Sequence, residues 1–183
     1  DFRILKSRQL APGVTFAAFL GLALYGSVFV LPVFLQSLHG YTASQTGMVI
    51  LPGALASALT MAVLGRNASR FDARPFIVTG ALLFLASMWM LSQLTLDASQ
   101  REFFWPLILR GIGLGMLFVP LTNATVAGLP LRQIGQGTGM FNLMRQLGGS
   151  LGIAIMATML SRLTKVEKAV LTDHVGRYDA ATL

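Results

Sequence analysis

The residues best suited to chemistry lie in a stretch that is otherwise apolar enough to enter a membrane. Residues 137–160 are long enough to cross a hydrocarbon layer of roughly 30 Å, yet they contain Arg145, with Asn142 before it and Gln146 directly after it. A guanidinium inside such a segment is costly unless it faces protein or water, and intramembrane charges typically mark a ligand or ion pathway. The segment therefore predicts the wall of a substrate cavity.

The spacing of small and polar residues places them on one side of the same helix. Asn142, Arg145, Gly149 and Gly152 recur at intervals of three or four residues, with Gly148 beside them. Glycines on a membrane helix allow a second helix to approach to backbone distance. We expect these three glycines to form a sliding interface, which is typical of a transporter.

A second set of candidate cavity residues comes from two other apolar segments. Tyr25, Phe29 and Gln36 share one helical face of residues 14–38, and either form a cavity wall or take part in ordinary helix packing. In the fourth segment, Asn123 follows Met116 by two turns. These two residues either contact a ligand or serve helix packing.

The fourth segment also carries an arginine followed by closely spaced glycines. Arg110 is either part of a conformational switch or an anchor that extends toward the membrane boundary. Gly111, Gly113 and Gly115 disfavour a helix in water but allow tight crossing in a membrane.

Composition argues against a soluble protein. Of the 183 residues, 54% are hydrophobic and only 11% are charged, against roughly 25% charged in soluble domains. The net charge of +7 is spread between apolar blocks and forms no basic patch, so a nucleic-acid partner is not expected. The chain does not begin with methionine, and we interpret it as a piece of a longer polypeptide.

Charge-poor blocks predict an all-α, polytopic membrane bundle. A juxtamembrane segment (1–13) precedes a five-helix unit (14–160) and an amphipathic tail (161–183). The predicted spans are residues 14–38, 44–64, 76–96, 103–127 and 137–160.

Lysine and arginine predict the orientation. The N-terminal segment and the second and fourth connections hold seven of them, and the first and third connections hold only Arg101. The positive-inside rule therefore predicts a cytoplasmic N-terminus and an extracytoplasmic tail in the inner or plasma membrane.

Acidic residues are absent from all five predicted spans. A proton-coupled carrier usually needs a carboxylate in its pathway, so its proton acceptor would have to lie elsewhere in a longer chain. Paired acids or clustered histidines, as an integral membrane enzyme would need, are also missing. No metal site and no cofactor are expected.

Together these residues resemble the C-terminal half of a major facilitator superfamily carrier, in the fourteen-helix drug:proton antiporter branch of the EmrB/QacA kind. Residues 65–74 are similar to the cytoplasmic loop motif Gly-x-x-x-Asp-Arg-x-Gly-x-Arg, with Ser69 in place of the acid and Asp72 in place of the second glycine. The segments 110–115 and 142–152 are similar to the fourth- and fifth-helix motifs of a half. The loop residues assigned to conformational change by this resemblance are Gly65, Arg66, Arg70, Asp72 and Arg74.

The resemblance implies five of the six helices of one half, with the third helix peripheral and the other four bordering the central cavity. It implies a multidrug efflux antiporter that exchanges small amphipathic or cationic drug-like compounds for protons by alternating access. A periplasmic adaptor protein is an additional candidate partner, besides the lipid bilayer. A uniporter or symporter for a metabolite, a membrane enzyme and a non-transporting scaffold remain the alternatives.

Overall fold

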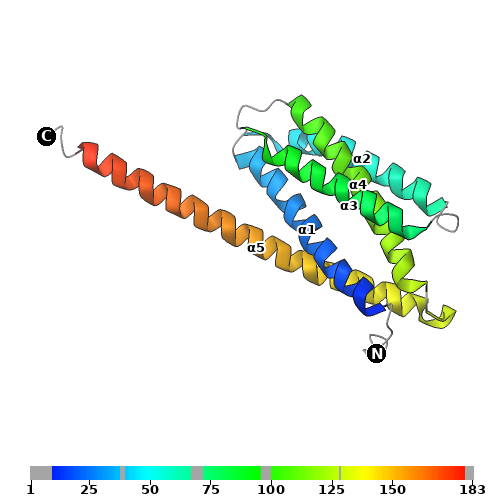
Figure 1. Ribbon diagram of the computed structural model, residues 1–183. Helices are drawn as coiled ribbons and strands as arrows, with labels where there is room; N and C mark the ends of the chain where they lie inside the picture. Colours follow the sequence, from blue (N-terminus) through cyan, green and yellow to red (C-terminus); the bar gives the residue numbers. More distant parts are fainter. Residues whose placement is uncertain (1–9, 38–39, 67–71, 96–99, 128, 180–183) are drawn as a thin grey trace.

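The chain folds into five long helices, with no strand among the residues that the structure describes. The computed structural model describes residues 10–37, 40–66, 72–95, 100–127 and 129–179 (Figure 1). Each helix holds a stretch long and apolar enough to cross a membrane. The prediction of an all-α polytopic membrane bundle is thus confirmed. The helices are α1 (Leu10–Ser37), α2 (Ala43–Arg66), α3 (Ala73–Ser92), α4 (Gln100–Val126) and α5 (Leu131–Asp179).

The helices begin between one and six residues before the predicted spans. Polar residues at a membrane boundary keep helical hydrogen bonds, so apolar composition marks the span more closely than it marks the helix. The largest difference is in α5, which also continues without a break past residue 160. Residues 161–179, the described part of the tail predicted for residues 161–183, therefore continue the same helix, and in Figure 1 they project away from the other four.

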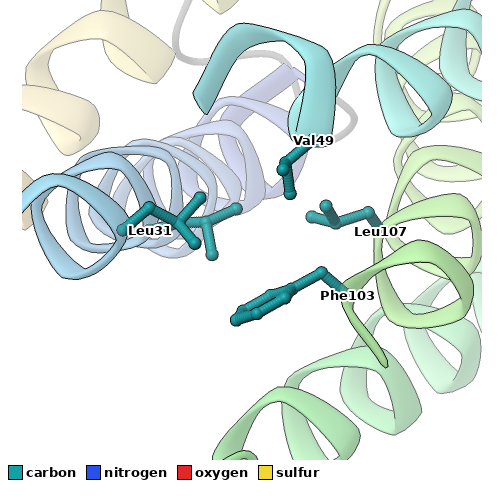
Figure 2. Close-up of a cluster of buried hydrophobic side chains, with 5 residues drawn as sticks. Leu31, Val49, Phe103 and Leu107 are labelled. Carbon is teal, nitrogen blue, oxygen red and sulfur yellow. The ribbon is translucent and has the colours of Figure 1, made fainter. Parts of the chain in front are cut away.

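The bundle is organised around α1 and α4. Helix α1 packs against α5, while α2 and α3 both pack against α4, which is the most buried of the five spans. Two apolar clusters tie these groups together. The first joins α1, α2 and α4 (Figure 2), and the second joins α1, α4 and α5. The first consists of Leu31, Leu35, Val49, Phe103 and Leu107, and the second of Ala17, Leu121 and Phe141.

The glycines of α4 face two different neighbours. Gly111 and Gly115 face α2, where a Cβ on the opposing Gly53 would lie 2.6 Å from a main-chain oxygen of α4. Gly113 faces α3, where an added Cβ would lie 2.8 Å from the carbonyl oxygen of Gly80. Because a side chain at these positions would meet backbone atoms, glycine is what permits α4 to contact both helices at once.

A short turn fixes the junction of α1 and α2. Gly40 has a φ of 66°, a left-handed conformation that glycine adopts without steric cost. The amide of Thr42 donates to Gln45 Oε1 at 2.9 Å, and the amide of Gln45 donates to Thr42 Oγ1 at 3.3 Å. This reciprocal capping box satisfies amides at the start of α2.

Helix α3 lies at the edge of the bundle. Gly80 and Ser87 are its buried residues and face α4, while Val78, Leu82 and Trp89 are exposed. A continuous apolar face of this kind suits contact with lipid chains rather than with water.

Candidate functional site

Arg145 lies near the middle of the apolar stretch of α5, thirteen residues after Arg132 and seventeen before Arg162. Its Nη1 donates to the hydroxyl oxygen of Tyr25 at 3.1 Å, and its Nη2 donates to Asn142 Oδ1 at 3.4 Å. Asn142 precedes Arg145 by one turn of the same helix, whereas Tyr25 comes from α1. The arginine is therefore held by its own helix and by the helix packed against it.

Aromatic rings from two helices surround the guanidinium group. Its central carbon lies 5.8 Å from the ring centroid of Tyr25 and 5.2 Å from that of Phe118 on α4. Phe118 is in turn held edge-on by Phe141, with ring centroids 6.2 Å apart and planes inclined by 75°. Both contacts lie within the range of a cation–π interaction.

The free energy of these contacts is large enough to offset the cost of placing an arginine inside a membrane. Insertion scales place the cost of an arginine at mid-bilayer at about 3 kcal/mol. A hydrogen bond to a charged group contributes about 1.5–3 kcal/mol, and a cation–π contact contributes about 0.5–2 kcal/mol.

Arg145 nevertheless has one guanidinium nitrogen without a partner in these helices. Its Nε is buried and has no hydrogen-bond partner. Among the residues described, no acidic side chain pairs with it. One N–H of the guanidinium therefore has no acceptor among these helices.

Glycine brings the backbones of α1 and α5 together beside this arginine. A Cβ at Gly152 would lie 2.5 Å from the carbonyl oxygen of Leu22, and one at Gly148 would overlap the carbonyl oxygen of Ala18. The glycines predicted to allow backbone-distance approach thus lie at such a contact. Their role in movement stays a prediction.

Two further glycines link this contact to the arginine itself. A Cβ at Gly21 of α1 would overlap the carbonyl oxygen of Arg145, and one at Gly149 would overlap the ring of Tyr25. The position of the hydrogen-bonding hydroxyl of Tyr25 therefore depends on the absence of a side chain at residue 149.

The structure brings only part of the predicted cavity set together. Tyr25, Asn142 and Arg145 form one group. Phe29 is half-buried one turn beyond Tyr25 on α1, and Gln36 and Gln146 are exposed to the outside of these helices. Tyr25, Phe29 and Gln36 lie along one side of α1, but of the three only Tyr25 contacts Arg145.

Met116 and Asn123 do not join the Arg145 group. Met116 packs toward α3, where a Cβ on Gly80 would lie 2.8 Å from its Cβ, and its sulfur lies 4.0 Å from Thr79 Oγ1. Asn123 is exposed. Their spacing places these residues on a different side of α4 from Phe118, and the contacts of α4 with α2 and α3 turn the Phe118 side toward Arg145.

Phe118 is the site residue that sequence reasoning missed. It follows Arg110 and Leu114 at four-residue spacing along α4, which is the only available signal that it shares their side. For a phenylalanine in an apolar helix, the sequence alone does not distinguish a ligand contact from core packing.

The predicted loop motif forms no ion pair within the part of the chain that the structure describes. Gly65, Arg66 and Arg74 are exposed. Asp72 precedes α3 without a capping hydrogen bond from its side chain. Arg70 lies outside the described residues, so the motif as a whole stays a prediction.

Arg110 is partly buried and has one guanidinium nitrogen enclosed by these helices. It lies nine residues after Arg101 along α4, and its Nη1 is buried with no hydrogen-bond partner. An anchor would present its guanidinium nitrogens to water or lipid headgroups.

Comparison with known proteins agrees with this architecture. The family model described as Major Facilitator Superfamily matches residues 1–153. An uncharacterized MFS-type transporter of Bacillus subtilis, YhcA, is 30% identical over 98% of this chain and 34% of its own length. The multidrug export protein EmrB of Escherichia coli is 26% identical over 98% of this chain and 35% of its own length. The colistin resistance protein EmrB of Acinetobacter baumannii is 29% identical over 90% and 32%, respectively. The chain thus spans about a third of the length of these relatives.

Proposed function

The chain belongs to the major facilitator superfamily, and from this premise we propose that it forms part of a proton-coupled multidrug exporter that works by alternating access. The observation that carries the proposal is the Arg145 group. A charged side chain at the middle of a membrane span, held by Tyr25 and Asn142 and ringed by aromatics, suits a cavity for amphipathic compounds.

The names of similar proteins support export as the direction. Two of them are a multidrug export protein and a colistin resistance protein. By analogy, the whole protein moves drug-like compounds out of the cytoplasm, with the N-terminus of this segment on the cytoplasmic side. A periplasmic adaptor is proposed as a further partner.

Alternating access moves one helix bundle against another around the binding site, and we propose that helices also shift within this bundle. The α1–α5 contact supports this proposal because Gly148 and Gly152 present no side chain to the opposing backbone. We assign α1 and α5 as the moving pair, with Arg145 at their junction.

Coupling to protons needs a titratable group that these spans lack. No aspartate or glutamate lies between residues 2 and 71 or between residues 103 and 166. In this proposal the coupling carboxylate comes from the part of the whole protein that lies outside this chain, and Arg145 serves the substrate.

The test is transport by the full-length protein in proteoliposomes under an imposed pH gradient. Ethidium, 4-butylbenzamide and 4-butylbenzoate serve as cationic, neutral and anionic probes. Arg145→Ala should abolish gradient-driven movement of every probe that the wild type transports. Arg162→Ala, which removes an exposed arginine of the same helix, should leave transport near the wild-type rate.

Two results would count against the proposal. Full activity of Arg145→Ala would reduce the arginine to a structural role. A transport rate that does not depend on the pH gradient would instead favour a uniporter.

A further inference from the structure

A second arginine lies beside a cavity between α2 and α4. The cavity has a volume of about 330 Å³ and is bordered by Arg110. Apart from this arginine, Ser57 is the only residue with a polar side chain among those that line it. The apolar lining residues include Ile50, Ala54, Met61, Leu107 and Leu114.

One nitrogen of the Arg110 guanidinium is not satisfied by these helices. Its Nη1 is buried without a partner, and within the described part of the chain no acidic side chain pairs with it. A buried charged donor without an acceptor costs more than an unpaired neutral group. The arrangement is consistent with an acceptor that arrives from outside.

The charge of the described spans favours an acceptor that carries negative charge. Arg110 and Arg145 lie within apolar helices, and both have a buried nitrogen without a partner. The spans contain no aspartate or glutamate to offset them. In a medium of low dielectric constant, two such charges repel a cationic ligand and attract an anionic one.

We infer that the cavity between α2 and α4 binds the carboxylate of an amphipathic organic anion. Arg110 pairs with the carboxylate, since its planar fork matches that group, and the apolar lining holds the rest of the molecule. The hydroxyl of Ser57 is a second available donor. This inference rests on the proposed transport function and narrows its substrate class.

The cavity is separate from the Arg145 group but close to it. Arg110, Leu114 and Phe118 follow one another at four-residue spacing on α4, so the two arginine sites lie on neighbouring sides of one helix. The separation along its axis is about 12 Å, or two turns.

The test compares a matched acid and amide, 4-butylbenzoate and 4-butylbenzamide, which share their apolar body and size. Equilibrium binding is measured on the full-length protein in nanodiscs at pH 8, where the acid is ionised. The wild type should bind the acid at least about tenfold more tightly, the factor expected for one hydrogen bond to a charged group.

Arg110→Gln should lower that ratio to near one while amide binding is retained, which also shows that the variant is folded. Arg110→Lys should keep an intermediate ratio, because the charge remains but the fork is lost. The matched control is Arg101→Gln, since Arg101 is exposed at the start of the same helix and borders a different cavity. This control should keep the wild-type ratio.

Three results would overturn the inference. The first is an unchanged ratio in Arg110→Gln. The second is loss of the ratio in Arg145→Gln alone, which would place the carboxylate at the other arginine. The third is equal binding of acid and amide by the wild type, as expected if Arg110 pairs with a carboxylate of the protein itself. In each case gradient-driven transport of the probes would still support the proposed function, whereas its absence would refute that function independently.

Discussion

At the scale of single residues, the guanidinium of Arg145 is held by a hydroxyl, an amide and two aromatic rings. The hydroxyl of Tyr25 is the closest of its polar contacts, at 3.1 Å, and comes from another helix. Tyr25 therefore fixes the arginine relative to α1, whereas Asn142 fixes it only relative to α5.

This geometry predicts different results for two conservative substitutions. Arg145→Lys should retain little transport, because an ammonium cannot serve Tyr25, Asn142 and a ligand in one plane. Tyr25→Phe keeps the ring and loses only the hydroxyl, so it should reduce the transport rate by roughly tenfold, the equivalent of one charged hydrogen bond. Initial rates in proteoliposomes measure both. A wild-type rate for Arg145→Lys would mean that only the charge matters.

Part of this site follows from the sequence and part does not. Asn142 and Arg145 are three residues apart on one helix, so their proximity is fixed by helix geometry alone. Tyr25 was predicted on a shared face of its helix, and it contacts Arg145. Phe118 was missed, and Met116 and Asn123 lie apart from the Arg145 group, because no local pattern determines how α4 is rotated against its neighbours.

At the scale of elements, glycine determines which helices meet. The α1–α5, α2–α4 and α3–α4 contacts each place a glycine against opposing main-chain atoms. Helix association in a membrane depends on such close packing, because lipid is as apolar as the side chains. The existence of five helices was predictable from composition, but the pairs that they form were not.

The α1–α5 contact yields a prediction on stability. Gly148→Ala adds a Cβ that overlaps the carbonyl oxygen of Ala18, and overpacking of this kind costs about 1–3 kcal/mol. The full-length variant should therefore unfold at a lower temperature than the wild type. The matched control is Gly139→Ala on the same helix, where an added Cβ meets nothing within 4 Å.

The control should be at least as stable as the wild type, since alanine favours a helix by about 1 kcal/mol over glycine. Equal unfolding temperatures for the two alanine variants would mean that α1 and α5 separate at little cost. The close contact would then contribute nothing to the fold.

The length of α5 is the element-level feature that composition did not predict. Its apolar span ends near Arg162, but the helix continues to Asp179. Apolar content reports where lipid contact ends, whereas helix formation depends on backbone propensity and continues through polar residues such as Lys165 and Lys168.

At the scale of the whole molecule, the distribution of positive charge makes a prediction on orientation. Ser44 and Gln133 are exposed near opposite ends of the bundle. In a cysteine-free background, Ser44→Cys should react with a membrane-impermeant maleimide added to intact cells. Gln133→Cys should react only with a permeant reagent. Outside labelling of Gln133→Cys would reverse the assigned topology.

The central claim is that this chain belongs to an exporter driven by protons, and direct measurement of coupled flux tests it. The full-length protein is reconstituted in vesicles that contain a pH-sensitive dye, a pH gradient is imposed, and the three probes are added in turn. The predicted result is that a transported probe accelerates collapse of the gradient in wild-type vesicles beyond its effect in protein-free vesicles, whereas Arg145→Ala vesicles behave like protein-free ones. Movement of the probe at the same rate with and without the gradient, with no probe-dependent proton flux, would contradict the claim.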